Sequence, residues 1–291
     1  MRIPGTTRLI PGKTALRAIW LAGLAVVPAC YAAGGPALVV QDGTAGIEAS
    51  ALTNLTTHLT TAGYTVTNNV GVPTGSLATY KQIWDIRYNT TTPLSASDIT
   101  AYVAYMAGGG SLFVMGENTG FATRNNSIIS LVQSAGGGTI TAITANDNET
   151  VRAPFTGPNG VTSMAYLAAA GAPYPPGNGT FITVDSNMVG AALVFAPGKM
   201  TGAAAGSLII VFDVNFLDPG SGGSANSQAF TDNLIAYLAA PAAVQPYSPP
   251  ATVYPSTSVP TLSEWAMILL TGGLALVAAL KLRFSAVAHR E

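Results

Sequence analysis

Three short runs of consecutive apolar residues, 37–40, 112–115 and 208–212, constrain the fold of this chain more than any other feature. A strand that is apolar at every position has both faces buried, as in parallel sheets that helices cover on both sides. These runs alternate with segments of helical periodicity, which is typical of repeated strand–helix–strand units. The sequence therefore predicts an α/β domain with a three-layer, mainly parallel sheet and these runs as its central strands.

Helical and extended patterns alternate through the predicted domain, residues 34–240. Helices are expected over residues 48–62, from a Ser-x-x-Asp start at Ser95, around residues 126–133 and over residues 227–238. Strands are expected over residues 36–40, 64–70, 82–88, 111–115 and 207–214. Between residues 136 and 200, strand candidates at 139–144, 180–184 and 191–195 accompany a long irregular insertion at 154–178.

The first 33 residues have the pattern of a secretory signal peptide. Four basic residues precede an apolar stretch at residues 18–27, and the small residues Ala29, Ala32 and Ala33 follow. We expect cleavage after Ala32 or Ala33. Lipidation of Cys30, the only cysteine, is the alternative. Ordinary cleavage would leave a mature chain without cysteine, and hence without disulfides, thiol nucleophiles or thiolate metal sites.

The C-terminal end has the pattern of a membrane anchor. Residues 265–280 contain no charged residue, and as a helix they would rise roughly 24 Å. With its flanks, such a helix can cross a hydrocarbon core of about 30 Å. Trp265 suits the membrane interface, and Lys281 and Arg283 suit the cytoplasmic side. A buried helix of a soluble domain is the alternative, which the missing amphipathic face disfavours.

A spacer with six prolines, residues 241–260, precedes the anchor. Its composition favours an extended chain that can reach roughly 60 Å at about 3.1 Å per residue. The spacer would therefore hold the domain away from the membrane.

A short polar motif links the spacer to the anchor and consists of Val259, Pro260, Thr261, Leu262 and Trp265. The order of motif, apolar segment and basic tail resembles the IPTL-CTERM sorting signal of Gram-negative bacteria, Ile-Pro-Thr-Leu-x-x-Trp-Gly. Four residues match, while Val259 replaces the Ile and Ala266 replaces the Gly. The resemblance implies that residues 261–291 are recognised by an exosortase-type enzyme. The precursor would be anchored in the inner membrane, and the processed protein would reach the periplasm or cell surface.

The charge of the predicted domain limits its partners. Residues 34–240 carry five basic and eleven acidic residues, which gives five minus eleven, or −6. Such a domain is a poor ligand for nucleic acid or for anionic lipid surfaces. We therefore expect the protein to contact the membrane only through its C-terminal anchor.

Two parts of the domain resemble class I glutamine amidotransferase-like domains, whose sheet is flavodoxin-like. They are the Gly-rich turn, strand and Gly116–Gly120 segment of residues 108–120, and the strand end at residues 211–214 with the helix that follows. In active members a Gly-x-Cys-x-Gly elbow carries the nucleophile. Asn118 stands at that position here, and the second half of the domain has no histidine. The resemblance implies the fold without the activity, so no catalytic residue, metal or cofactor is assigned.

Polar residues follow several predicted strands, where ligands bind to open parallel sheets. They are Asp42, Glu117, Asn118, Asp213 and Asn215, and we call them the rim residues. Such oxygen-rich groups suit a hard cation or a sugar. The alternative is that they only form turns and cap helices. His58 and His289 have no evident partner in the sequence.

Two functions remain open at this point. One is an exported envelope or surface protein with a non-catalytic binding or scaffold domain, for which an extracellular polysaccharide is a candidate partner. The other is an envelope hydrolase that uses the strand-end carboxylates.

Overall fold

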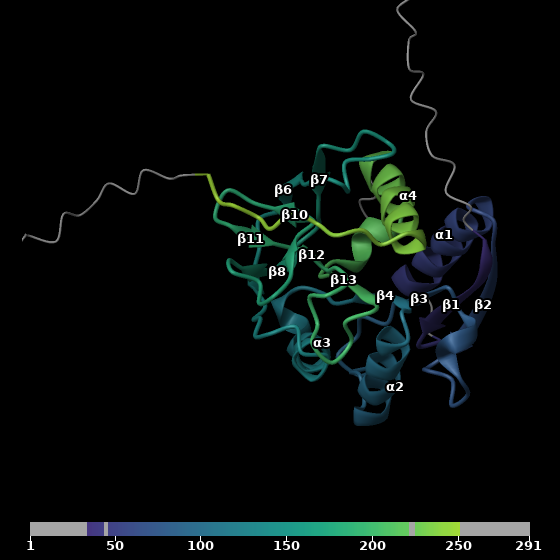
Figure 1. The fold of residues 1–291 in the computed structure, drawn as a ribbon. Coiled ribbons are helices and arrows are strands. Elements are labelled where there is room, and N and C mark those ends of the chain that lie inside the picture. Colours follow the sequence, from purple (N-terminus) through teal and green to yellow (C-terminus); the bar gives the residue numbers. More distant parts are fainter. Residues whose placement is uncertain (1–33, 44–45, 221–224, 251–291) are drawn as a thin grey trace, which may run out of the picture. The chain divides into compact units, whose positions relative to one another are not determined.

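A seven-stranded sheet forms the centre of the domain (Figure 1). The computed structural model describes residues 34–43, 46–220 and 225–250, and those up to Pro246 belong to one compact unit. The strand order is β2-β1-β3-β4-β13-β12-β9. The first five of these strands are parallel, and β12 is antiparallel to both of its neighbours. The predicted α/β domain with a mainly parallel sheet is therefore confirmed.

The helices and strands agree with most of the predicted ranges. The sheet consists of β1 (Gly35–Gln41), β2 (Tyr64–Val70), β3 (Gln82–Asp85), β4 (Ser111–Met115), β9 (Thr180–Phe181), β12 (Ala192–Phe195) and β13 (Ser207–Val211). The α-helices are α1 (Ile47–Thr61), α2 (Ala96–Ala107), α3 (Ala122–Ser134) and α4 (Ala225–Ala239). Three short 3-10 helices accompany them, η1 (Leu77–Thr79), η2 (Thr119–Phe121) and η3 (Val214–Leu217). The three apolar runs lie in β1, β4 and β13, apart from Phe212, which follows β13, and each of these strands has a strand on both sides.

Helices cover the sheet on both faces. In Figure 1, α1 and α4 lie together on one side of the sheet, and α2 and α3 lie on the other. On the α1–α4 side, Trp84 of β3 stacks on Phe113 of β4 with ring centroids 4.4 Å apart. Both join a buried cluster with Leu55 of α1 and Phe230 of α4. Burial of such large apolar side chains on both faces is what makes the strands apolar at every position.

Residues 143–190, apart from β9, form a small β-lobe beside the main sheet (Figure 1). One three-stranded sheet has the order β10-β6-β7 and another the order β11-β8-β5. Their strands are β5 (Ile143–Thr144), β6 (Asn148–Val151), β7 (Ser163–Ala165), β8 (Ala170–Pro173), β10 (Thr183–Val184) and β11 (Val189–Gly190). The lobe shares the core of the main sheet, since Met164 and Ile182 belong to the same buried cluster as Val194.

The β-lobe corrects three predicted ranges. The insertion at residues 154–178 is not irregular throughout, because β7 and β8 lie within it. The strand predicted at 139–144 is reduced to β5, and the one predicted at 180–184 is divided at Ile182 between two sheets. Strands of two to four residues are too short for periodicity to reveal, and distant partners define them.

Two strands of the main sheet end earlier than predicted, in each case near a carboxylate that bonds the following backbone. The strand predicted over 82–88 ends at Asp85, which accepts a hydrogen bond from the Arg87 backbone N–H. The strand predicted over 207–214 ends at Val211, and Asp213 then caps η3. Short polar side chains compete with strand pairing in this way.

The predicted start of α2 is confirmed in detail. Ser95 Oγ accepts a hydrogen bond from the Asp98 N–H at 3.1 Å, and Asp98 Oδ2 accepts one from the Ser95 N–H at 3.2 Å. This reciprocal pair is a capping box.

The predicted signal peptide, sorting motif and transmembrane helix lie outside the described residues, as does the second half of the spacer, residues 251–260. Among the residues that the structure describes, no helix combines the length and apolarity needed to cross a membrane. The membrane anchor at residues 265–280 therefore stays a prediction.

Candidate functional site

The rim residues lie at one edge of the sheet, because β1, β4 and β13 are parallel and end there. Asp42 follows β1, Glu117 and Asn118 follow β4, and Asp213 and Asn215 follow β13. A direct bond joins two of these ends, since Glu117 Oε2 accepts a hydrogen bond from the Val214 N–H at 2.9 Å.

Asp42 lies toward the α1 side of the rim. Its backbone N–H donates to Glu48 Oε1 at 2.7 Å. Tyr88 lies between this pair and the β4 end: burial raises the pKa of its phenol, and the charges of Glu48, Glu117 and Asp42 raise it further. The rim residues thus lie near one another, although their roles differ.

Glu117 is buried, and its carboxylate bonds the protein backbone instead of being exposed to a ligand. Its side chain is only 3% exposed. Oε1 accepts hydrogen bonds from the backbone and side-chain N–H groups of Asn118 at 3.0 and 3.1 Å, while Oε2 is bonded to Val214. Burial raises the pKa of the Glu117 carboxyl to about 7, with the backbone donors acting against burial and Asp213 adding to it.

Asn125 of α3 fixes the backbone of Glu117. Its Oδ1 accepts from the Glu117 N–H at 3.0 Å, and its Nδ2 donates to the Glu117 carbonyl at 2.7 Å. Glycine at position 116 makes this arrangement possible, because a Cβ there would lie 2.4 Å from a ring carbon of Phe212 and 2.9 Å from Asn125 Oδ1.

Asp213 is fully buried and holds a loop of the β-lobe. Oδ2 accepts a hydrogen bond from the Leu167 N–H at 2.6 Å, and Oδ1 accepts one from the Asn215 N–H at 2.8 Å. Burial raises the pKa of the Asp213 carboxyl to about 6. Asp213 therefore joins the end of β13 to the segment between β7 and β8.

That segment, residues 166–169, is bonded at nearly every position. The Tyr166 N–H donates to the Asp147 carbonyl at 2.6 Å, and the Ala168 N–H donates to Asp147 Oδ1 at 3.0 Å. Ala168 has a φ of 64°, in the left-handed region that alanine rarely occupies. Leu167 next to it is 51% exposed. The carboxylates of Asp213 and Asp147 thus hold a strained loop in place.

An open cleft of about 560 Å³ lies between this loop and the end of β4. We call it the rim cleft. Its lining combines small apolar and uncharged polar residues with one acid: Asn118, Thr119, Thr144, Ala145, Asn146, Asp147, Ala168 and Ala169. Only Asn118 is a rim residue. Thr119, in η2, directly follows Asn118, and the sequence missed the remaining six because they come from the β-lobe, whose position the local pattern does not reveal.

A buried ionic network under the same edge was also missed. Asp85 Oδ2 accepts from Arg87 Nη2 at 2.6 Å and from the Tyr102 hydroxyl at 2.8 Å, while Arg124 Nη2 donates to Asp85 Oδ1 at 3.1 Å. Burial alone would raise the pKa of Asp85, but the charges of Arg124 and Arg87 outweigh it and hold the pKa below its ordinary value. The one signal in the sequence is a pair of opposite charges within the apolar run at residues 82–88.

Arg124 also ties the network to the backbone. Its Nε donates to the Met115 carbonyl at 3.0 Å and its Nη1 to the Thr92 carbonyl at 3.1 Å. The network positions the ends of β3 and β4, and every polar group named here is occupied by the protein itself.

The expectation that His58 has no partner is wrong. Its Nδ1 lies 2.6 Å from Asp232 Oδ1 and its Nε2 lies 2.7 Å from Gln228 Oε1, so it joins α1 to α4. The partners are about 170 residues away in sequence, which is why local reasoning could not identify them. Among the described residues, no three His, Cys, Asp or Glu side chains are grouped to hold a metal ion.

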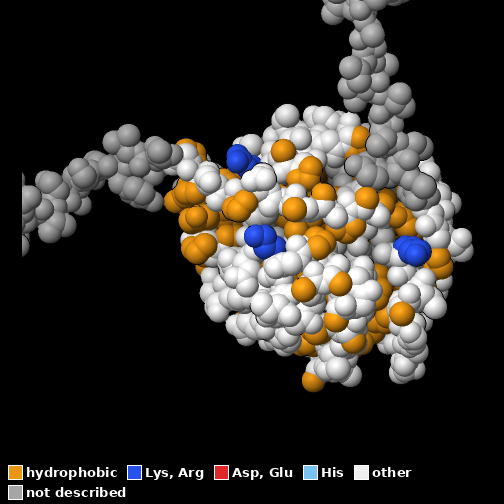
Figure 2. Space-filling model, in the orientation of Figure 1, with side chains coloured by type: hydrophobic (Ala, Val, Ile, Leu, Met, Phe, Trp, Pro, Cys, Tyr) orange, Lys and Arg blue, Asp and Glu red, His pale blue; other side chains and the backbone are white. Residues whose placement is uncertain are grey.

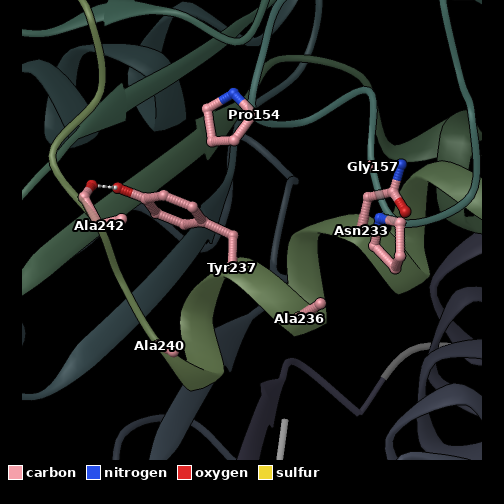
Figure 3. Close-up of a pocket in the computed structure, with 8 residues that line it drawn as sticks. Pro154, Gly157, Asn233, Ala236, Tyr237, Ala240 and Ala242 are labelled. Atoms are coloured by element: carbon pink, nitrogen blue, oxygen red, sulfur yellow. Dashed lines mark hydrogen bonds between the residues drawn. The ribbon is translucent and has the colours of Figure 1, made fainter. Parts of the chain in front are cut away.

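A second pocket, of about 280 Å³, lies at the end of α4 (Figure 3). Figure 3 shows Pro154 and Gly157 of one loop facing Ala236 and Tyr237 of the helix. The Tyr237 hydroxyl donates to the Ala242 carbonyl at 2.9 Å, and Asn233 Nδ2 donates to the Phe155 carbonyl at 2.9 Å. Since these polar groups are engaged, the pocket offers a mainly apolar surface without a reactive group.

Comparisons with known proteins identify the C-terminal end of the chain. Residues 257–284 match the family model of the IPTL-CTERM motif. The chain thus carries the predicted C-terminal sorting signal, which implies an exported protein that an exosortase-type enzyme processes. A search of curated proteins found no match.

Solved structures give only a likeness of fold. The chain is similar to the mmIFT52 N-terminal domain at 10% identity with a TM-score of 0.52, over 69% of this chain and 97% of that one. It also aligns with the exo-beta-1,4-mannosidase Op5Man5 from Opitutaceae bacterium strain TAV5 at 13% identity. That alignment has a TM-score of 0.44 and covers 72% of this chain and 37% of the mannosidase. These structures do not support the resemblance to glutamine amidotransferase-like domains.

Proposed function

We propose that this protein is a surface-sorted binding protein, in which the C-terminal signal delivers a non-catalytic α/β domain to the cell envelope. The observation that carries the non-catalytic part is the bonding of the rim carboxylates. Each oxygen of Glu117 and of Asp213 accepts at least one hydrogen bond from a backbone N–H.

A catalytic carboxylate must reach the atom it protonates or attacks. Glu117 is 3% exposed and Asp213 is fully buried and bonded to the loop at residues 166–169, so neither carboxylate is open to a substrate. Their bonds instead organise the wall of an open cleft. Buried and fully bonded polar groups of this kind rigidify a site.

The charge distribution argues further against nucleic acid and anionic membranes as ligands of the domain. Of its five basic residues, Arg87 and Arg124 form buried ion pairs with Asp85. The basic side chains visible in Figure 2 are few and well separated, and they form no continuous patch. A binding partner of this domain is therefore expected to be uncharged or basic.

One observation favours a second candidate, an envelope hydrolase. The pKa values of Glu117, about 7, and Asp213, about 6, are of the kind that general acids and bases require. The variants Glu117→Ala and Asp213→Ala separate the two functions. Because they remove the acceptors of several buried backbone N–H groups, they should lower the free energy of unfolding.

The measurement pairs urea unfolding with assays on chromogenic glycosides and esters. Wild-type hydrolysis that disappears in both variants while their unfolding curves stay unchanged would establish the hydrolase and reject the proposal. Loss of stability in a protein that turns over none of these substrates would support a binding domain.

Sorting is tested by replacing Pro260, Thr261 and Leu262 with alanine. These residues lie between the extended spacer and the predicted membrane helix, where a membrane-embedded protease would have access. Export should continue, and full-length protein should accumulate in the inner membrane. The matched control replaces Ser248, Pro249 and Pro250, which lie in the spacer before the motif, and should be processed normally.

Mass spectrometry of the wild-type protein decides the outcome. If the protein remains uncut through Glu291 in a host with a matching exosortase, the sorting proposal fails and a plain single-pass anchor replaces it.

A further inference from the structure

We propose that the rim cleft is a binding site for a neutral glycan. The inference rests on the proposed function of the domain as a binding module, and it identifies the class of ligand. It follows from the shape of the cleft, its unoccupied polar groups, its rigidity and its charge.

The composition of the lining fits a sugar ring. Ala168 presents an exposed methyl group, and Ala145 and Ala169, which are buried, are small enough to leave room, while Thr119 and Asn146 place polar side chains around them. A sugar offers apolar C–H faces and a ring of hydroxyl groups, so it matches a surface that alternates in this way. The cleft is open, which allows a chain of sugars to pass through it.

Several polar groups of the cleft remain available to a ligand. The side chains of Thr119, Thr144 and Asn146 are exposed, and they make no hydrogen bond to other residues in the described part of the chain. Asp147 uses Oδ1 to bind the Ala168 N–H. Its Oδ2 accepts no hydrogen bond from the described residues and can accept one from a hydroxyl group. Hydroxyl groups of a sugar donate and accept, so they can pair with all four side chains.

The cleft wall is rigid before any ligand arrives. Asp213 and Asp147 bind consecutive N–H groups, those of Leu167 and Ala168, and hold Ala168 at its positive φ. Backbone strain that the surrounding structure maintains is a frequent feature of ligand sites. A preformed site loses less conformational entropy on binding, which favours weakly interacting ligands such as sugars.

The charge of the cleft selects against other ligands. Asp147 is the only charged residue in the lining, and no basic residue accompanies it. A phosphate, sulfate or uronate would therefore meet repulsion without compensation. A cation would find a single carboxylate, since the described residues contain no group of three potential metal ligands. An uncharged, hydroxyl-rich ligand is what remains.

A pair of aromatic rings extends the surface next to the cleft. Phe121 lies in the same 3-10 helix as Thr119. The centroid of its ring lies 5.7 Å from the centroid of the Tyr88 ring. Both side chains are partly exposed. Aromatic rings with an exposed portion can contact the apolar face of a second sugar unit.

The experiment uses the full-length protein, purified in a detergent without a sugar head group. An array of neutral and acidic glycans identifies ligands, and isothermal titration calorimetry measures the dissociation constant of each hit. The test variant is Thr119→Ala with Asn146→Ala, which removes two exposed polar groups from the cleft. Its matched control is Thr67→Ala with Asn68→Ala, two exposed residues of β2 at the far edge of the sheet.

The expected result is binding of a neutral glycan that weakens about tenfold or more in the cleft variant and stays unchanged in the control, at equal thermal stability. Absence of any neutral glycan among the hits, equal affinity in the cleft variant, or preference for acidic glycans would each overturn the inference.

Localisation and processing of the same variants keep this test separate from the proposed function. Loss of the glycan inference with correct sorting leaves a binding domain for another ligand. Failure of sorting in the wild type contradicts the proposed function whatever the array shows.

Discussion

Buried acids in this domain fall into two classes that differ in their partners. Asp85 faces two arginines, and their charges keep its pKa below the ordinary value despite burial. Glu117 and Glu149 face mainly backbone N–H groups and hydroxyls, and burial raises their pKa values to about 7 and about 8. At the scale of single residues, the first class therefore stabilises the domain as an ion, whereas the second is more stable when protonated.

Replacement of Asp85 should be among the most damaging single changes. Asp85→Asn leaves Arg124 buried without a compensating charge and Arg87 with Asp98 alone, which should cost about 3 to 5 kcal/mol of unfolding free energy. Asp98→Asn is the matched control, because Asp98 lies at the edge of the same network and bonds Arg87 at 3.3 Å. It should cost about 1 kcal/mol or less. Urea unfolding of both variants measures the difference, and similar losses would contradict the central role of Asp85.

Glu149 should make the domain less stable as the pH rises. It is buried in the β-lobe. Each of its carboxylate oxygens accepts a hydrogen bond from the Ala191 N–H at 3.0 Å, and Oε2 also accepts one from the Thr183 hydroxyl. Burial raises its pKa from 4.5 to about 8, and the charge of Asp185 adds to the effect. Because the folded state holds the proton more tightly, its contribution is complete below about pH 4.5 and is lost as the pH rises to about 8.

The variant Glu149→Gln tests this dependence, since it imitates the protonated acid at every pH. At about pH 5 its unfolding free energy should lie within about 1 kcal/mol of the wild type, and at about pH 9 it should exceed the wild type. Urea unfolding at the two pH values is the measurement. Parallel pH profiles for wild type and variant would show that Glu149 does not titrate in this range.

At the scale of elements, local signals located those whose ends are fixed by nearby residues. The capping box at Ser95 lies within a few residues of the helix that it bounds, so the pattern identified it. The β-lobe depends on distant pairing instead. Strand β6 pairs with β7 on one side and, on the other, with β10, which lies more than thirty residues further along the chain. The strands of the lobe are too short to show a period, and their partners could not be inferred.

The capping box gives a prediction for α2. Ser95→Ala removes the acceptor of the Asp98 N–H and should lower the unfolding free energy by about 1 kcal/mol. Thr100→Ala is a control within the same helix, because its hydroxyl bonds only the carbonyl of Ala96 on the exposed face. That change should stay within about 0.5 kcal/mol. Equal effects of the two substitutions in thermal unfolding would contradict a stabilising role of the cap.

At the scale of the whole molecule, the two ends of the chain determine where the domain functions. Residues 1–33 have the pattern of an export signal, and residues 257–284 match the IPTL-CTERM motif. The domain between them is acidic, and its described residues form the rim cleft of mixed polarity. Export and sorting thus constrain the function more tightly than the fold does, because one fold supports many functions.

The topology of the precursor is a prediction at this scale. Residues 34–260 should lie outside the cytoplasm and residues 281–291 inside, because Lys281 and Arg283 follow the apolar segment. Alkaline phosphatase, which is active only in the periplasm, should be inactive when fused after Glu291. The same enzyme fused after Pro260 should be active, which controls for expression and export. An active fusion after Glu291 would overturn the proposed orientation.

The sequence by itself determined the parts of this protein that depend on neighbouring residues. Apolar runs predicted the central strands, the Ser-x-x-Asp pattern predicted the start of α2, and the motif at residues 259–265 predicted the sorting signal. It also led us to expect the rim residues at one edge, because the carboxyl ends of parallel strands coincide.

Tertiary structure alone decided what those residues do. Glu117 bonds the N–H of Val214, 97 positions away, and Asp213 bonds that of Leu167, 46 positions away. These two carboxylates, which the sequence suggested as ligand groups, therefore bond the protein's own backbone. The cleft is lined instead by Thr144, Asn146 and Asp147 from the β-lobe. Local patterns reveal the period and ends of an element, but a hydrogen bond between distant segments exists only after the chain has packed.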